Sequence, residues 1–179
     1  MEHSYRINLG MYALRPLAQS DIEALRALRN ASRNCFLHNA VITEQQQLNW
    51  YQRYLVREGD YMFALTQSTD NAAFLGAVAL YGVTRQKGTA ESGRILVDKT
   101  AAPQRGVGTA ALRGICTFGF RDLKLLQITA EILPENTASI RIHEKAGYRL
   151  IHKTGQCLQY ALAYQQFRAQ YPELLQEEL

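Results

Sequence analysis

The sequence predicts one α/β domain over residues 1–179, with a mixed, mostly antiparallel β-sheet and helices on both of its faces. Two observations support this fold class. The first half reads as a strand, two amphipathic helices and a meander of strands, and strands joined by short turns pair antiparallel. The second half reads strand, helix, strand, helix, strand, and such a crossover sets its two strands parallel.

The first half begins with a short strand expected at 11–17. Ser20 to Glu23 matches a capping box, so a helix is expected from there to about Arg33. A second box, Thr43 to Gln46, starts another helix, which ends near Gly59-Asp60. Apolar, β-favouring runs then predict strands at 61–66, 73–81 and 91–97, the first two separated by the turn-forming residues 68–71.

The second half opens with a helix expected at 106–120. A strand at 125–133, a helix at 137–146 and a strand starting at Gly147-Tyr148 follow. The alternating residues 158–164 favour a strand hairpinned through Thr154-Gly155, although the same segment suits a helix equally well. A last helix is expected from about Gln166.

Bulk properties narrow the class of protein. The formal charge is +4, but lysines and arginines are scattered singly, which argues against a nucleic-acid interface and leaves a pocket for a polyanionic small molecule. No apolar stretch is long enough for a membrane span, and the N-terminus lacks the pattern of a secretory signal. Three separated cysteines show neither disulfide nor metal spacing. We expect a cytoplasmic protein without nucleic-acid, membrane or metal partners.

The turn Gln104-Arg105-Gly106-Val107-Gly108-Thr109 lies between a strand and a helix and is typical of an anion site. Glycines let the backbone approach a phosphate, and the first N–H groups of the helix point at it. A P-loop needs a lysine directly after the last glycine, where this chain has Thr109. A dinucleotide fold needs this unit near the N-terminus of a longer chain.

Two segments resemble the GNAT acetyltransferases. PQRGVGTAAL is similar to their Q/R-x-x-G-x-G/A pyrophosphate loop, with Pro103 as a departure at its first position. ILPENTASIRIHEKAGY is similar to their N-x-x-A/S-I-x-L-Y-x-K-x-G-F segment, from Asn136 to Tyr148. The resemblance implies a GNAT fold in which two central parallel strands splay apart and hold acetyl-CoA. It divides the chain into an acceptor half (11–90), an acetyl-CoA half (91–155) and a C-terminal strand and helix (156–179).

The resemblance also implies which residues bind acetyl-CoA: Leu96, Val97, Gln104, Arg105, Gly106, Val107, Gly108, Thr109, Ala110, Asn136 and Ser139. Acetyl transfer needs a neutral amine and a proton for the leaving thiolate. The family's tyrosine acid is replaced by His143, which either donates that proton or binds the acceptor, with Tyr160 as the next candidate. Glu91 is the expected base and Glu131 the alternative.

The acceptor is expected to be a small-molecule amine that attacks the thioester directly in a ternary complex. Phe36, His38 and Trp50 are the candidate substrate-binding residues, although aromatic residues on helices more often belong to a core. The segment 24–55 resembles that of GNAT members that acetylate nucleotide-linked amino-sugars. Members that acetylate protein N-termini, a non-catalytic acyl-CoA-binding module, and a homodimer stay open as alternatives.

Overall fold

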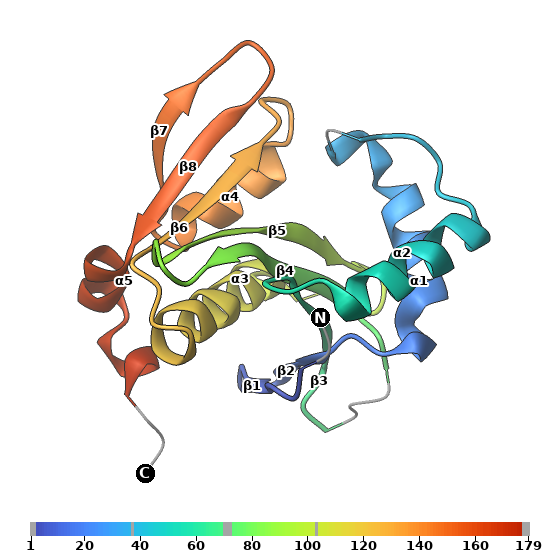
Figure 1. The fold of residues 1–179 in the computed structure, drawn as a ribbon, viewed down its shortest axis with the longest axis horizontal. Coiled ribbons are helices and arrows are strands. Elements are labelled where there is room, and N and C mark those ends of the chain that lie inside the picture. The colour runs from blue at the N-terminus through green and yellow to red at the C-terminus, as the bar shows by residue number, and fades with distance from the viewer. Residues whose placement is uncertain (1–2, 37, 70–72, 103, 177–179) are drawn as a thin grey trace.

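The computed structural model describes residues 3–36, 38–69, 73–102 and 104–176 (Figure 1). An eight-stranded sheet runs through the molecule in the order β1-β2-β3-β4-β5-β6-β8-β7. Its strands are β1 (Ile7–Asn8), β2 (Tyr12–Pro16), β3 (Tyr61–Gln67), β4 (Gly76–Thr84), β5 (Thr89–Val97), β6 (Gln127–Ile132), β7 (Arg149–Lys153) and β8 (Leu158–Ala163). All neighbours are antiparallel except β5 and β6, which are parallel. The mixed, mostly antiparallel sheet is therefore confirmed.

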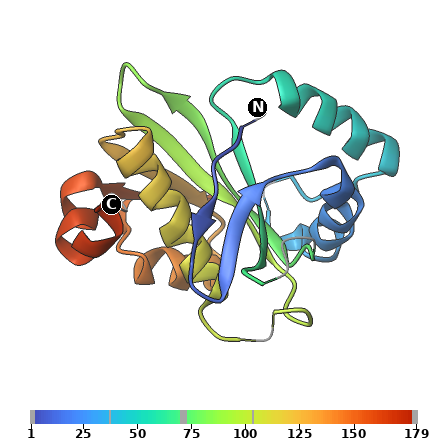
Figure 2. The same ribbon diagram turned by 90° about the horizontal axis from the view of Figure 1, so that it is seen from below.

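Helices cover both faces of the sheet, as predicted (Figure 2). They are α1 (Ile22–Ala31), α2 (Glu44–Val56), α3 (Val107–Thr117), α4 (Thr137–Lys145) and α5 (Tyr164–Gln170). One core joins the sheet to α3 and α5 through residues such as Leu112, Ile115 and Phe167. A second, smaller core on the other face joins it to α1 and α2 through Leu25, Tyr51 and Tyr54.

The central parallel pair is splayed. β5 and β6 are paired only at Thr89–Gln127, Ala90–Ile128 and Glu91–Thr129. Beyond these pairs β5 continues along β4 and β6 continues along β8, so the two strands diverge (Figure 1). The V expected between the strands lies there, with the backbone edges of both facing it.

A β-bulge bends β5 along one arm of the V. Ala77 pairs with Leu96 but Ala79 pairs with Gly93, so Arg94 and Ile95 together face the single residue Val78. The extra residue reverses the alternation of side chains: Leu96 joins the core under α1 and α2, whereas Ile95 packs on the opposite core. The bulge therefore decides which β5 side chains face the acceptor half.

The two expected capping boxes have different outcomes. Thr43 and Gln46 exchange their hydrogen bonds as predicted, and α2 starts at Glu44. The box from Ser20 to Glu23 is wrong: a 3₁₀ turn precedes α1, and the Asp21 carboxylate accepts the Ala18 amide at 2.8 Å. Asp21 also binds both terminal nitrogens of the buried Arg15, a bidentate pair that outweighs a hydroxyl cap.

The C-terminal elements confirm the strand interpretation of 158–163 and shift the next helix. α5 begins at Tyr164, two residues earlier than expected, because Gln166 closes its first turn by accepting the Ala163 amide at 3.1 Å. α3 passes into a π-helical turn at Phe118–Asp122 before β6. Pro103 and the turn residues Asp70 and Asn71 lie outside the described part of the chain.

Candidate functional site

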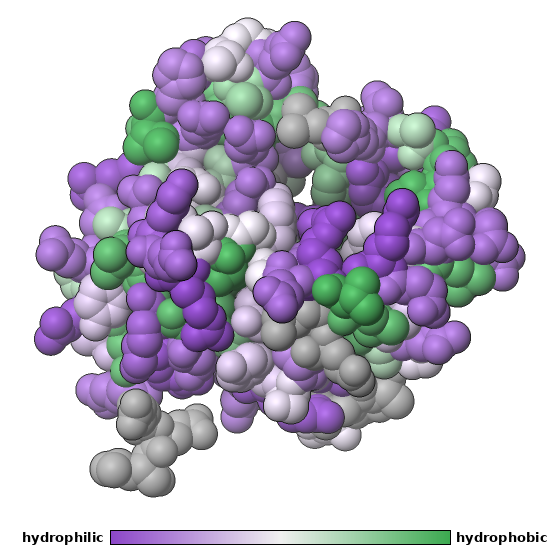
Figure 3. Space-filling model, in the orientation of Figure 1, coloured by the Kyte–Doolittle hydropathy of each residue, from purple (hydrophilic) through white to green (hydrophobic). Residues whose placement is uncertain are grey.

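The splay of β5 and β6 organises the candidate site. β6, β8 and α4 lie on one side of the opening, and α1 and α2 lie on the other (Figure 1). The space-filling view shows the surface hollowed between these two parts, with hydrophilic side chains on its walls (Figure 3). The N-terminus of α3 follows β5, so a long ligand in the V extends toward that helix.

The glycine turn has the geometry of an anion site. Gly106 is the N-cap of α3 and has φ +91°, a left-handed conformation that favours glycine. The first intrahelical bond runs from the Ala110 amide to the Gly106 carbonyl at 2.9 Å, and no side chain caps the N-terminus. Within the part of the chain that the structure describes, the amides of residues 107–109 are therefore candidates to bind a phosphate.

One hydrogen bond and one close helix contact hold this turn in position. The Tyr12 hydroxyl donates to Gln104 Oε1 at 2.8 Å and ties the loop to β2. A Cβ on Gly108 would come within 2.9 Å of Ile142 Cδ1, so this glycine lets α3 pack closely on α4. Gly106 has open space at the same point. Gly106 therefore lies on an open side of the turn, where a ligand could approach, and Gly108 serves helix packing.

Asn136 and Ser139 form the start of α4. Asn136 Oδ1 accepts the Ser139 amide at 3.1 Å and caps the helix, while its Nδ2 donates to the Cys35 carbonyl at 3.0 Å. The second bond connects the β6–α4 loop to the segment between α1 and α2. The Asn136 side chain therefore holds together the two sides of the opening, and its contact with pantetheine stays a prediction.

His143 is buried on α4, with only 2% of its surface exposed. Nδ1 lies 2.8 Å from the Ser139 carbonyl, which only accepts, so Nδ1 carries the proton and Nε2 has a free lone pair. Nε2 is buried and has no hydrogen-bond partner among the described residues. Burial lowers the pKa of His143 to about 4, with the Ser139 bond opposing it. The imidazole is therefore neutral near pH 7.

Glu91 lies in the last paired position before the strands diverge. The Tyr81 hydroxyl of β4 donates to Glu91 Oε1 at 2.5 Å. Burial raises the pKa of Glu91 and the nearby Glu131 raises it further, while the Tyr81 hydrogen bond and Arg94 lower it. Burial also strongly raises the pKa of Tyr81, so its phenol stays protonated and donates. A partly buried carboxylate with a raised pKa at the apex of the V has the properties of a general base.

The two alternative residues have other partners. Glu131 is exposed on β6 and accepts from Gln159 Nε2 at 3.2 Å. The Tyr160 hydroxyl donates to Glu144 Oε1 at 3.1 Å, and burial followed by that bond raises its pKa. Both groups are engaged with neighbouring side chains.

The acceptor candidates occupy two places. Phe36 and His38 surround Arg29: its guanidinium lies 3.6 Å from the Phe36 ring centroid and donates to the His38 carbonyl. Trp50 stacks on Tyr54 at 5.5 Å, within the core under α2. The structure thus groups Phe36 and His38, whereas the Trp50 ring takes part in helix packing.

Tyr81 and Arg94 were missed by the sequence reasoning. Arg94 Nη1 binds Asp60 at 2.7 Å and its guanidinium lies 4.2 Å from the Tyr81 ring. An arginine next to a glycine in a strand that carries a candidate base was the available signal. The bulge at Arg94 and the contact of Tyr81 with Glu91 depend on how β4 and β5 pair, and the sequence does not give that register.

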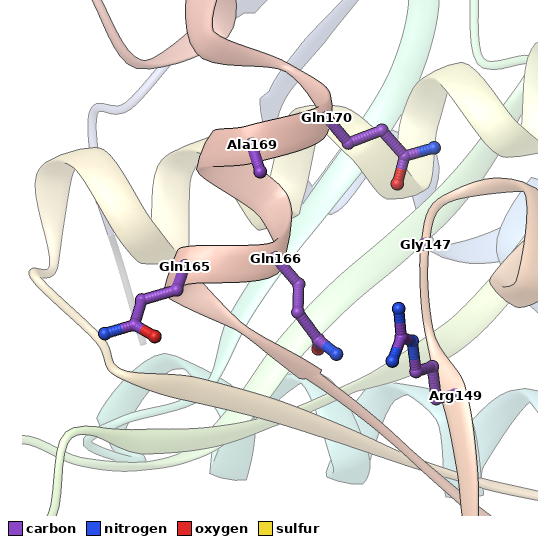
Figure 4. Close-up of a pocket in the computed structure, with 6 residues that line it drawn as sticks. All are labelled: Gly147, Arg149, Gln165, Gln166, Ala169 and Gln170. Carbon is purple, nitrogen blue, oxygen red and sulfur yellow. The ribbon is translucent and has the colours of Figure 1, made fainter.

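Another hollow lies away from the V, between α5 and the start of β7. It is shallow and is lined by Gly147, Arg149, Gln165, Gln166, Ala169 and Gln170 (Figure 4). None of the predicted site residues lines it. Within the described residues, no helix is long and apolar enough to cross a bilayer, and no group of three acidic, histidine or cysteine side chains is placed to hold a metal.

Comparisons with known proteins show the family of the chain. The acetyltransferase (GNAT) domain family matches residues 12–149. A probable N-acetyltransferase of Bacillus subtilis, YjcK, is 29% identical over 153 residues, covering 79% of this chain and 81% of the relative.

Solved structures show the same fold. Apo FdhC, a nucleotide-linked sugar GNAT, superposes with a TM-score of 0.81 at 20% identity, covering 97% of this chain and 100% of its own. Spermidine N-acetyltransferase from Vibrio cholerae, in complex with CoA and spermine, has a TM-score of 0.75 at 16% identity, covering 88% and 98%. The family match shows that the chain belongs to the GNAT family and is an acetyl-CoA-dependent N-acetyltransferase.

Proposed function

We propose that the protein transfers the acetyl group of acetyl-CoA to the amine of a nucleotide-linked amino-sugar, by direct attack in a ternary complex. The observation that carries the reaction is the Tyr81–Glu91 pair at the apex of the V. A ligand lying along the splayed strands brings its thioester to this point, and the acceptor half faces it from α1 and α2.

Glu91 is the proposed base. An amine arrives largely protonated near neutral pH, and the ammonium must lose a proton before its lone pair attacks the thioester. The raised pKa of Glu91 brings its proton affinity nearer to the working pH than that of an exposed carboxyl group. Tyr81 holds the carboxylate and donates to it, so the base keeps its orientation while it accepts the proton.

The residues of the acetyl-CoA half fit the cofactor at three points. The uncapped amides at the start of α3 suit the pyrophosphate. The edges of β5 and β6 beyond the last pair suit the amides of the pantetheine arm. The buried Nε2 of His143, which has no hydrogen-bond partner among the described residues, can accept a hydrogen bond from an N–H or O–H group of the bound substrates.

The role proposed for His143 follows from its tautomer. A neutral imidazole with its proton on Nδ1 accepts at Nε2 and cannot donate there. His143 therefore acts as a buried acceptor that orients a substrate N–H group. The leaving thiolate needs only modest acid help. It takes its proton from the nitrogen of the tetrahedral intermediate, which loses that proton as the amide forms, or from water.

Charge favours an anionic acceptor over a polyamine. Residues 22–43, which carry α1 and the following loop, contain one acidic residue, Glu23, against Arg26, Arg29 and Arg33. Glu23 is paired with Arg26, so Arg29 of α1 and Arg33 after it give this segment a net positive charge. Positive charge repels a polycation and attracts the phosphates of a nucleotide-sugar. The structurally similar FdhC is a nucleotide-linked sugar GNAT, which supports the same class of acceptor.

The pyrophosphate site is tested by a pair of substitutions at Gly106. Aspartate and asparagine both tolerate a left-handed conformation, both are good N-caps, and both have open space at this position. We expect Gly106→Asp to weaken acetyl-CoA binding about tenfold or more relative to Gly106→Asn, because it places a charge of about one unit against the pyrophosphate. Calorimetric titration measures both affinities, and equal affinities would place the pyrophosphate elsewhere.

The base is tested by its pH profile. Glu91→Gln is expected to lower kcat by about 10²- to 10⁴-fold. Tyr81→Phe removes a donor to the carboxylate and raises the pKa of Glu91, so the acid limb of kcat/KM moves to higher pH. Glu131→Gln removes a negative neighbour and lowers that pKa, so the limb moves to lower pH. Shifts in the same direction would assign the limb to another group.

His143→Gln separates an acceptor from an acid. Glutamine keeps an acceptor oxygen but cannot titrate, so we expect turnover within about tenfold of the unmodified enzyme, while His143→Leu loses more. Thiol release from acetyl-CoA measures both variants. A loss of 100-fold or more in the glutamine variant would return the acid role to His143.

The acceptor is tested with a panel of amines at saturating acetyl-CoA. We expect kcat/KM for a UDP- or dTDP-linked amino-sugar to exceed that for spermidine and for N-terminal peptides by about 100-fold or more, which corresponds to roughly 2.7 kcal/mol. The same amino-sugar without its nucleotide is the matched control and should show a raised KM. Preferential turnover of spermidine or peptides would contradict the proposal.

A further inference from the structure

Arg94 has an unusual backbone conformation. It occupies the bulge of β5 with φ +52°, in the left-handed backbone region that residues other than glycine rarely adopt. Such a conformation costs free energy and persists only where the surrounding contacts enforce it. The contacts of the Arg94 side chain are therefore candidates for what holds this conformation.

The bulge turns the Arg94 side chain toward the acceptor face of the sheet. Its Nη1 binds Oδ1 of Asp60 at 2.7 Å, and Asp60 is only 2% exposed. The guanidinium then lies over the Tyr81 ring, 4.2 Å from the centroid. Asp60 therefore holds the guanidinium in place over the Tyr81 ring.

Tyr81 is confined from its other side by the strand itself. A Cβ on Gly93 would lie 2.8 Å from the Tyr81 hydroxyl, so the phenol passes directly over this glycine to reach Glu91. The ring is held between the backbone of β5 and the guanidinium of Arg94. In this position the hydroxyl donates to the Glu91 carboxylate.

We propose that Arg94 is a positioning residue for acetyl transfer, which acts through Tyr81 to hold the Glu91 carboxylate at the apex of the V. This inference rests on the proposed role of Glu91 as the base. Arg94 acts at one remove from the reacting atoms: it orients the phenol, and the phenol orients the carboxylate.

The charged and titratable groups around this chain of contacts come from several elements. Glu131 of β6 raises the pKa of Glu91, and Arg94 lowers it. On the other side, burial raises the pKa of Tyr54 in α2 to about 12, and the hydrogen bond with Met62 lowers it. Among the charged and titratable neighbours, Asp60 and Tyr51 raise this pKa further and Arg94 lowers it. Arg57 also contacts Asp60, at 3.7 Å, but its side chain is 61% exposed. Arg57 therefore shares the anchor of Arg94 and provides a matched control.

The test compares Arg94→Gly, Arg94→Gln and Arg57→Gln. Glycine adopts the bulge conformation without strain, so the first variant removes the side chain and keeps the backbone. We expect it to lower kcat about 10- to 100-fold, with the acetyl-CoA affinity unchanged. Glutamine keeps a planar group and a donor to Asp60, so it should recover most of that loss. Arg57→Gln should match the unmodified enzyme.

The pH profile adds a readout that a merely structural role would not move. Losing the Arg94 charge raises the pKa of Glu91, so the acid limb of kcat/KM moves to higher pH in both Arg94 variants. Circular dichroism and thermal melting establish that each variant is folded. An unshifted limb and an unchanged kcat in a folded Arg94→Gly variant would overturn the inference.

A double-mutant cycle tests whether Arg94 acts through Tyr81. In a Tyr81→Phe background, Arg94→Gly should lower kcat by no more than about twofold further, because the hydroxyl it orients is gone. Independent, multiplicative losses would overturn the inference. Full activity of Glu91→Gln would instead show that Glu91 is not the base. Failure of the proposed function is therefore distinguishable from failure of the inference on Arg94.

Discussion

Backbone pairing between β5 and β6 stops after three residue pairs, and the acetyl-CoA half is built around that point. Hydrogen bonds next to the last residue pair hold the two strands at this point. Ser92 Oγ donates across the gap to the Thr129 carbonyl at 3.2 Å and lies 2.7 Å from the Tyr148 hydroxyl, which contacts Cys116 Sγ at 3.2 Å. These contacts join both strands to α3 and to the chain leaving α4. A hydrogen-bond network therefore holds the two strands together at the point where they diverge.

The same divergence separates the chemistry onto the two faces of the sheet. The His143 ring packs against Tyr148 of the larger core, and the N-terminus of α3 follows β5 at the end of the V. The Tyr81–Glu91 pair lies on the acceptor side, where the bulge of β5 also turns Arg94. In the proposed function, an amine reaches the thioester from one side of the V, while the pyrophosphate of the cofactor is bound on the other side.

Local rules predicted most elements because each depends on neighbours in the chain. The capping box at Thr43 needs only residues three apart, and the glycine turn needs only a strand before it and a helix after it. Ser20 failed as a cap because Arg15, buried against the sheet, takes the Asp21 carboxylate. The start of α5 moved by two residues because Gln166 closes the first turn.

The sequence by itself determined the order of elements, the family resemblance, the anion turn at Gly106 and Glu91 as a candidate base. Only the tertiary structure decided how these groups act. The tautomer of His143 depends on the Ser139 carbonyl and on burial, and the partner of Glu91 comes from β4 through strand register. The guanidinium over Tyr81 depends on one extra residue in β5. Burial and cross-strand contacts join residues far apart in the chain, so no local pattern encodes them.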